Sequence, residues 1–317
     1  MCVTASPAPL TGIELDLPDR RVGKVRVSYA WGAAARLFVT TDRLSAFDQI
    51  IAGVPWKGQV LNQLAAWWFE QTADVVTNHV VSVPDPNVTI GRAAHPLPVE
   101  VVVRGYITGV TDTALWTAYE RGERTVYGHE LPDGLAKNEA LPAAIVTPTT
   151  KGEAGEHDVP VTCDEVVDRG LVEPDLWTRI QAIALDLFAR GVELGEAAGL
   201  ILADTKYEFG LTDDGELLLI DEMHTPDSSR WWIADSYEER MLRGEEPESL
   251  DKEVVRRALR DVGYSGDGPP PELPGEVWAA TTARYVDAYE RLTGASFHPA
   301  DYPADERIRA VVAALEP

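Results

Sequence analysis

The sequence is poor in basic residues and lacks long apolar runs, and each shortage excludes a class of function. Its 317 residues hold 28 Lys and Arg against 52 Asp and Glu, so the formal net charge is −24. Such a charge repels phosphate backbones, which argues against nucleic acid or an anionic membrane as a partner. No apolar run reaches roughly 18 residues and the start shows no secretory signal, so we expect a cytoplasmic protein.

Cysteine is also scarce. Cys2 and Cys163 are too few for a disulfide framework or a four-ligand zinc site. Walker, Rossmann and nucleophile-elbow motifs are missing from the sequence as well. The few basic residues that fall in segments punctuated by Gly, Pro or Asp suggest an anion site, because buried cations need partners. These residues are Lys24, Arg26, Lys57, Arg104, Lys151, Lys206 and Arg230.

The pattern of apolar residues changes near residue 108, and the length suits two domains. Before it, one helix presents Leu61, Leu64, Ala65 and Trp68 on one face. Short β-type runs surround this helix over 24–30, 35–41, 79–83, 88–93 and 98–107. After it, helices are predicted near 112–121, from a capping box at Thr162, over 175–198 with Gly199 as the C-terminal stop, and through 235–317. The sequence therefore predicts an α+β protein with a β-rich lobe, residues 1–107, and a second lobe, residues 108–317, that holds a hairpin and a helical tail.

The hairpin is predicted by two β-type runs, 200–211 and 216–222, around Asp214-Gly215. Asp204, Lys206 and Glu208 alternate along the first run and therefore share one face.

If Asp214-Gly215 is a two-residue turn, Glu208 lies opposite Asp221 with Cβ atoms about 5 Å apart. Two carboxylates this close need a cation between them, and Mg²⁺ with nucleotide phosphates is the usual occupant of such an oxygen-only site. Lys206 would stand near the same phosphates. The alternative is a solvated hairpin face with one Glu–Lys pair. The loop that follows, over 221–232, is rich in acids and hydroxyls and ends with an arginine, as binding loops are.

Three other segments combine cations with glycine or hydroxyl groups. Gly23-Lys24-Val25-Arg26 could grip phosphates or form a solvated edge strand, and Arg104 leaves a valine-rich run between glycines. Thr147 to Lys151, followed by Gly152, Gly155 and Glu156-His157-Asp158, suits a loop over phosphates, with a polar surface loop as the alternative. A lone histidine such as His157 or His224 is more often a hydrogen-bonding residue than a base. From residues alone the prediction is a magnesium-nucleotide enzyme with an anionic substrate.

Read together, these segments resemble the phosphoribosylaminoimidazole-succinocarboxamide synthase (SAICAR synthetase) family in its longer, plant-like form. The matching motifs run in order from about residue 20 to 260. They are Gly23 to Arg26, Thr41 to Asp48, Lys57 to Gln63, Val103 to Gly109, Thr147 to Lys151, Glu156 to Asp158, Ala203 to Gly210 and Asp221 to Arg230. A stretch like Thr111 to Trp116 marks the plant-like form.

The resemblance implies a two-lobed fold, related to ATP-grasp and kinase-like folds, with ATP in a cleft between the lobes. It also implies an ATP- and Mg²⁺-dependent ligase that joins L-aspartate to a carboxylate on a ribosylated azole. By this resemblance, ATP and its metal would contact Gly23, Lys24, Arg26, Arg92, Lys151, Glu208 and Asp221, the last two as the Mg²⁺ ligands. The ribotide would contact Ser45, Arg104, Asp204, Lys206, Ser229 and Arg230. Lys24, Lys151, Lys206 and Asp48 would serve the reaction itself.

Some positions depart from the family pattern and leave other functions open. Val110 stands where a serine commonly helps to hold the substrate phosphate, and Glu139 replaces the Gln expected after Lys137-Asn138. One alternative is therefore a paralogue that ligates aspartate to another ribosylated azole carboxylate, as in nucleoside-antibiotic synthesis. A small-molecule kinase and a nucleotide-binding regulatory protein are the others. We expect a monomer or a small homo-oligomer.

Overall fold

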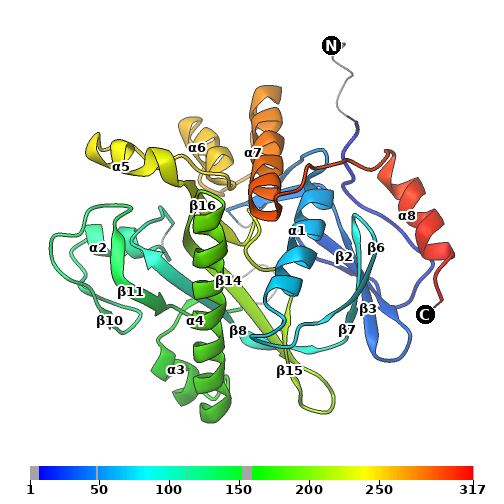
Figure 1. Cartoon of the computed structure of the whole chain (residues 1–317), viewed down its shortest axis with the longest axis horizontal. Coiled ribbons are helices and arrows are strands. Elements are labelled where there is room, and N and C mark those ends of the chain that lie inside the picture. The colour runs from blue at the N-terminus through cyan, green and yellow to red at the C-terminus, as the bar shows by residue number, and fades with distance from the viewer. Residues whose placement is uncertain (1–6, 48, 112, 152–158, 317) are drawn as a thin grey trace. The chain divides into compact units, whose positions relative to one another are not determined.

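The computed structural model describes residues 7–47, 49–111, 113–151 and 159–316. The chain forms two compact units, each assembled from separate stretches of sequence. Unit 1 holds residues 1–70, 79–93 and 250–317, and unit 2 holds residues 71–78 and 94–249. Figure 1 shows the elements of both units, which mix helices with antiparallel sheets and confirm the predicted α+β class.

Unit 1 is built on a five-stranded antiparallel sheet in the order β1-β2-β3-β7-β6. Its strands are β1 (Arg21–Val22), β2 (Arg26–Trp31), β3 (Ala35–Thr40), β6 (Val80–Asp85) and β7 (Val88–Arg92). Along β2 every second side chain is buried, as the period of a half-covered strand requires. Two further strands, β4 (Arg43–Ala46) and β5 (Gln49–Gly53), pair separately as an antiparallel hairpin.

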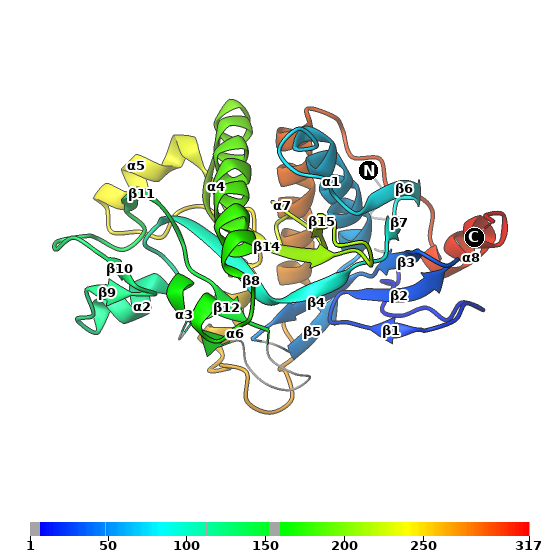
Figure 2. The same ribbon diagram turned by 90° about the horizontal axis from the view of Figure 1, so that it is seen from below.

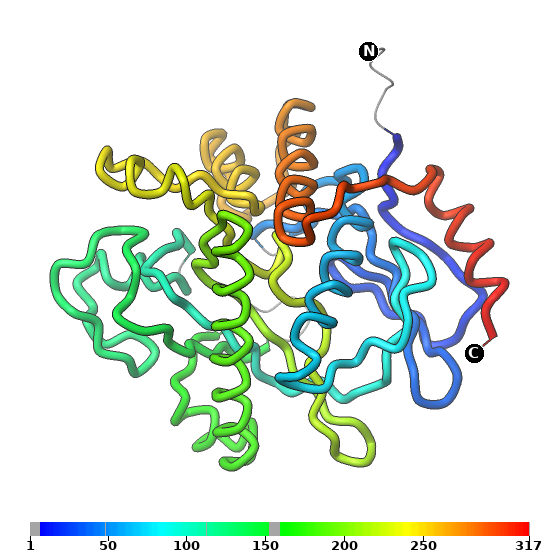
Figure 3. The backbone as a smooth tube through the Cα atoms, viewed as in Figure 1, coloured from blue at the N-terminus to red at the C-terminus, as the bar shows by residue number. Residues whose placement is uncertain are grey.

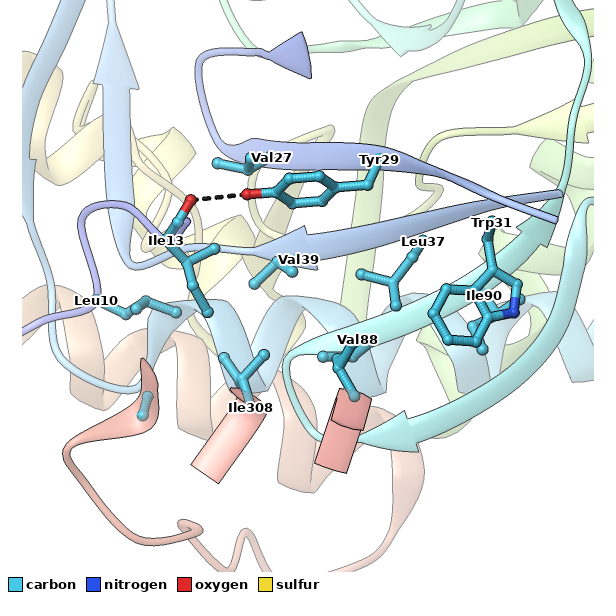
Figure 4. Packing of buried hydrophobic residues seen from close by; sticks show 12 residues of the cluster. Leu10, Ile13, Val27, Tyr29, Trp31, Leu37, Val39, Val88, Ile90 and Ile308 are labelled. Atoms are coloured by element: carbon cyan, nitrogen blue, oxygen red, sulfur yellow. Dashed lines mark hydrogen bonds between the residues drawn. The ribbon is translucent and has the colours of Figure 1, made fainter. Parts of the chain in front are cut away.

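The core of unit 1 joins the two ends of the chain. Val27, Leu37 and Val88 on the sheet pack against Ile308 of helix α8 (Ala304–Ala313), as Figure 4 shows. The Tyr29 hydroxyl donates a 2.9 Å hydrogen bond to the Ile13 carbonyl within the same cluster. Burying this many apolar side chains fixes the C-terminal helix on the N-terminal sheet. In Figure 3 the final segment runs beside the first strands for this reason.

The other helices of unit 1 also bring the tail to the N-terminal strands. The predicted amphipathic helix is α1 (Lys57–Gln71), and all four residues of its predicted apolar face lie within it. Three of these, Leu61, Leu64 and Trp68, are fully buried. Tyr285 of α7 (Gly275–Thr293) packs against α1, and Val255 of α6 (Glu253–Asp261) packs beside Leu44.

Unit 2 contains the long strands β8 (His95–Tyr106) and β14 (Leu200–Leu211), paired antiparallel at the centre of a seven-stranded sheet. Beside them lie β11 (Ala140–Val146), β12 (Thr149–Thr150), β13 (Val159–Pro160), β15 (Leu217–Ile220) and β16 (Ser229–Ile233). Smaller elements complete the unit: α2 (Leu115–Glu120), β9 (Thr125–Val126), β10 (His129–Glu130), α3 (Cys163–Asp168) and α5 (Ala234–Leu242).

Helix α4 (Pro174–Ala197) lies along β14, and Figures 1 and 2 show the two elements side by side. Gly191 allows this close approach, because a Cβ atom there would come within 2.5 Å of the His224 ring and 2.7 Å of Leu202. Gly199, with φ of +70°, follows the helix as predicted for its C-terminal stop. The predicted capping box is also present, with the Thr162 hydroxyl accepting from the Glu165 amide at the start of α3.

The lobe boundary predicted at residue 107 differs from the observed division. Strand β8 pairs with β14 and so belongs to unit 2, whereas residues 250–317 belong to unit 1. The prediction grouped residues that are contiguous in sequence. In the structure, the tail helices are instead buried on the N-terminal strands, which lie far from them in sequence. Within the described residues, no helix is both long and apolar enough to span a bilayer.

Candidate active site

The pairing of β8 with β14 places the predicted hairpin residues on one face of the sheet. Asp204 lies opposite Arg104, Lys206 opposite Val102, and Glu208 opposite Glu100. Because alternate residues of a strand point to the same face, Asp204, Lys206 and Glu208 line up along β14, as predicted. The alternating charges of one strand therefore form two clusters, one at Glu208 and one at Asp204.

The first cluster interleaves lysines and glutamates. The Lys206 ammonium is 2.6 Å from Glu100 Oε1 and 2.6 Å from Glu208 Oε1. The Lys151 ammonium pairs with the other oxygen of Glu208. All these side chains are at least two-thirds buried, the most exposed being Lys206 at 31%. The solvated hairpin face that was the alternative is therefore not what the structure shows.

The ionisation of this cluster follows from its geometry. Burial alone would raise the pKa of Glu208, but the ammonium groups of Lys206 and Lys151 outweigh burial and lower that pKa to about 2. Burial would likewise lower the pKa of Lys206, but Glu208, Glu100 and Asp221 together raise it well above its ordinary range. Glu208 and Lys206 consequently stay ionised near neutral pH.

The predicted pairing of Glu208 with Asp221 is wrong by one residue of register. Glu208 lies opposite Ile220, and Leu211 lies opposite Leu217. The turn is not the two-residue type: the Thr212 amide donates a 3.0 Å hydrogen bond to the Glu216 carbonyl, so three residues form the loop, and Gly215 has φ of +84°. Such a three-residue loop with a left-handed last residue is the next common hairpin type, and it shifts every cross-strand partner by one.

Asp221 reaches the cluster by a different route. It is the residue after β15 and has φ of +68°, a left-handed conformation that is uncommon outside glycine and is tolerated best by Asn and Asp. Its charge acts on Lys206, since it helps to raise the pKa of that ammonium. A local backbone turn, not the strand register, thus brings Asp221 near the charged face.

The second cluster surrounds Asp204. One oxygen of this carboxylate accepts from Arg104 Nη1 at 3.3 Å and from Arg230 Nη1. Arg104 also donates to the Thr147 hydroxyl at 2.8 Å and to the Thr113 carbonyl at 3.3 Å. Two guanidinium groups share one carboxylate in a buried place, so the cluster carries a net positive charge that suits a further anion.

Ser229 adjoins this second cluster. It lies opposite Thr205 in the pairing of β16 with β14, and the two hydroxyls are 2.7 Å apart. The five predicted ribotide residues of unit 2 (Arg104, Asp204, Lys206, Ser229 and Arg230) therefore gather on adjacent strands.

The remaining predicted residues belong to unit 1. Lys24 is exposed in the turn between β1 and β2 and is not part of the strand predicted from residue 24, whereas Arg26 begins β2. The Arg43 guanidinium donates to the carbonyls of Gly23 and Arg26, at 2.8 and 3.2 Å, and so fixes this turn.

Arg92 ends β7, and Ser45 is buried in β4. Asp48 and residues 152–158, including Glu156, His157 and Asp158, lie outside the described residues.

Two site residues were not predicted from the sequence. Glu100 is the only acid within β8 and faces Glu208 directly. A lone acid inside a valine-rich strand was the available signal. Tyr127 lies over the Arg104 guanidinium, 5.9 Å from it, and its hydroxyl donates to the Thr113 carbonyl at 2.9 Å. Nothing in the local sequence of Tyr127 indicates this long-range contact.

His224 is excluded as a general base by its surroundings. Its Nε2 is 2.6 Å from the Tyr207 hydroxyl, both rings are fully buried, and burial lowers the pKa of His224 to about 3. This agrees with the prediction of a hydrogen-bonding histidine.

The chemistry of the first cluster fits Mg²⁺ only together with a nucleotide. Mg²⁺ prefers oxygen ligands and usually combines one or two carboxylates with substrate phosphates and water. Glu208 and Asp221 supply such oxygens. In the part of the chain that the structure describes, no three His, Cys, Asp or Glu side chains are arranged to hold a metal by themselves.

Comparisons with known proteins agree with these features. The profile of the SAICAR synthetase family matches residues 20–271. The chain is 48% identical to the chloroplastic phosphoribosylaminoimidazole-succinocarboxamide synthase of Arabidopsis thaliana, covering 92% of this chain and 71% of that protein. It is 46% identical to the corresponding synthase of Legionella pneumophila (strain Lens), covering 92% and 93%.

Solved structures give the same result. The SAICAR synthase of Saccharomyces cerevisiae, solved in complex with SAICAR, superimposes with a TM-score of 0.78 at 33% identity, covering 92% of this chain and 100% of that one. With a family profile over most of the chain, close relatives along its length and a shared fold, this protein belongs to the SAICAR synthetase family.

Proposed function

We propose that this protein uses ATP to join L-aspartate to the carboxylate of carboxyaminoimidazole ribotide, forming SAICAR in purine biosynthesis. The observation that carries the proposal is a pair of charged clusters on β8 and β14, one with carboxylates that suit a metal and one with guanidinium groups that suit an anion. Glu208 and Asp204 are four residues apart on one strand, which corresponds to about 13 Å. An acidic, metal-compatible group and a cationic, anion-compatible group are thus held at a fixed separation on one rigid surface.

The metal and nucleotide phosphates are assigned to the Glu208 cluster. Glu208 and Asp221 would hold Mg²⁺ through oxygen, and the metal would neutralise phosphate charge. Lys151 now pairs with Glu208, and it would turn to the ATP phosphates once a metal occupies that carboxylate. From unit 1 we assign Gly23, Lys24 and Arg26 to the ATP phosphates and Arg92 to the adenine side.

The ribotide is assigned to the Asp204 cluster. Arg104 and Arg230 would hold its phosphate, because a guanidinium presents paired donors to phosphate oxygens. Asp204 keeps both guanidiniums oriented, Ser229 adds a hydroxyl, and Lys206 lies between the clusters, where the reacting carboxylate would be. Ser45 and Asp48 are assigned to the neighbourhood of that carboxylate and of L-aspartate.

The reaction proceeds by an acyl phosphate. A ribotide carboxylate oxygen attacks the γ-phosphorus of ATP, the bond to the β-phosphate oxygen breaks, and ADP leaves. The aspartate amine then attacks the acyl carbon, inorganic phosphate leaves, and the nitrogen loses a proton to give the amide. Lysine and arginine cations stabilise the charge that develops on the phosphoryl oxygens. We also propose that the protein acts in the cytoplasm as a monomer or small homo-oligomer, without nucleic-acid or membrane partners.

The activity is tested by incubating the protein with ATP, Mg²⁺, L-aspartate and carboxyaminoimidazole ribotide. Mass spectrometry should detect SAICAR, and ADP release should require aspartate. ADP release without aspartate would instead indicate a kinase. Turnover of another azole carboxylate, with none of this ribotide, would indicate the specialised ligase. The comparisons favour neither alternative.

The site assignment is tested by Glu208→Gln, which should lower kcat about 100-fold because it removes a charged ligand from the phosphoryl-transfer site. Asp213→Asn is the matched control, since this acid lies on the same hairpin and its side chain is 96% exposed. Equal activity in the two variants would contradict the assignment of Glu208.

A further inference from the structure

Glu100 belongs to the same buried charged cluster as Lys206 and Glu208, to which roles are assigned. It stands directly opposite Glu208 in the pairing of β8 with β14, and its side chain is only 13% exposed. Directly opposed side chains on neighbouring strands have Cβ atoms about 5 Å apart, and like charges at that distance destabilise the pair. The Lys206 ammonium relieves this repulsion, at 2.6 Å from a carboxylate oxygen of each acid.

Glu208 has one lysine on each of its oxygens, Lys206 on Oε1 and Lys151 on Oε2. A cation taken up by Glu208 must therefore displace at least one ammonium group. Lys206 can give up Glu208 and still keep a carboxylate partner, because Glu100 holds it as well.

Three acids, Glu208, Glu100 and Asp221, attract the Lys206 ammonium and together raise its pKa. Without Glu100, two of the three acids that attract this ammonium would remain. Lys206 would then turn to Glu208 and Asp221, the two acids proposed to bind the metal.

We propose that Glu100 is a positioning residue, which keeps a carboxylate partner for the Lys206 ammonium when Glu208 exchanges this ammonium for Mg²⁺. This inference rests on the proposed function, because it presupposes the metal at Glu208. It assigns Glu100 no direct contact with the metal or the substrate. Its effect on metal binding should therefore depend on the presence of the Lys206 ammonium.

A double-mutant cycle tests this dependence with Mn²⁺ as the probe. Free Mn²⁺ is measured by electron paramagnetic resonance while it is titrated into protein saturated with ADP, and a titration of ADP alone is subtracted. Glu100→Gln should raise the Mn²⁺ Kd roughly tenfold in the otherwise unchanged protein, and less than about threefold in a Lys206→Met background. The Asp213→Asn variant controls for the loss of one negative charge elsewhere on the same hairpin.

Equal effects of Glu100→Gln in both backgrounds would overturn the positioning role and leave the proposed function intact. Absence of Mn²⁺ binding by the unchanged protein would overturn the metal site and this inference with it. If circular dichroism shows that Lys206→Met is unfolded, Lys206→Gln takes its place, since its amide can donate to both acids without a charge.

Steady-state kinetics give a second readout. Glu100→Gln should raise the Mg²⁺ concentration needed for half-maximal rate about tenfold and leave kcat at saturating Mg²⁺ within about twofold of the unchanged protein. A large fall in kcat at saturating Mg²⁺ would show that Glu100 takes part in the reaction itself, and would overturn the positioning role.

Discussion

Removal of the Asp204 carboxylate should destabilise unit 2 strongly. Asp204 accepts from both Arg104 and Arg230, and the exposed fractions of the three side chains are 7%, 7% and 15%. In Asp204→Ala the two guanidinium groups remain in this buried place without the carboxylate between them. Arg104 keeps only neutral partners among its hydrogen bonds, the Thr147 hydroxyl and the Thr113 carbonyl.

The expected decrease in the free energy of unfolding follows from the missing counter-charge. Breaking a buried ion pair by deleting one partner costs about 3–5 kcal/mol, chiefly because the other charge stays buried. Here two like charges remain, so we expect a loss of about 4 kcal/mol or more in the free energy of unfolding. This is a large share of the roughly 5–15 kcal/mol that stabilises a typical domain. Asp204→Asn retains one acceptor oxygen and should lose less.

Urea unfolding measures this change, with tryptophan fluorescence as the probe. Trp231 and Trp232 on β16 follow Arg230 directly and are buried, so they report on this part of unit 2. Asp213→Ala is the control, because its 2.8 Å contact with His95 is exposed at both ends and should contribute nothing measurable. If Asp204→Ala lowers the free energy of unfolding no more than the control does, the reasoning is refuted. The two guanidinium groups would then be hydrated in the ligand-free protein.

Three further predictions concern other parts of unit 2. Thr162→Ala should remove the capping box of α3 and cost about 1 kcal/mol in urea unfolding, with exposed Thr178→Ala as the control. Burial lowers the pKa of His224 to about 3. Between pH 6.5 and pH 3 this histidine is therefore protonated in the unfolded chain and neutral in the folded chain. The free energy of unfolding should fall by about 1.4 kcal/mol for each unit by which the pH is lowered in that range. Unfolding measured across that range should lose this slope in His224→Asn but keep it when exposed His95 is replaced. Tyr127→Phe removes the hydroxyl that donates to the Thr113 carbonyl beside Arg104. The KM for the ribotide should rise about fivefold with little change in kcat. An unchanged KM would show that Tyr127 does not contribute to substrate binding.

The elements of this protein were largely predictable from the sequence because their signals are local. The spacing of Leu61, Leu64 and Trp68 identified α1, and the capping box at Thr162 and the stop at Gly199 marked helix ends that the structure confirms. The ordered motifs identified the family for the same reason, since each is a short contiguous stretch whose residues can be read without knowing the fold.

The partners of Glu208 were decided only by tertiary structure. An Asp-Gly pair serves both a two-residue turn and the last two positions of a three-residue loop, because glycine supplies the positive φ in either case. The sequence therefore could not set the register, and the observed loop puts Ile220 opposite Glu208. Asp221 reaches the cluster through its own left-handed backbone conformation, which no pattern of apolar residues reveals.

Long-range pairing decided the remainder. Glu100 and Glu208 lie more than a hundred positions apart in sequence, and only the pairing of β8 with β14 places them face to face. The helices of residues 250–317 likewise pack on the N-terminal strands and not on the segment that precedes them. Periodicity tells which face of an element is apolar, but the partner that buries this face is chosen by the free energy of packing the whole chain, which no local stretch of sequence contains.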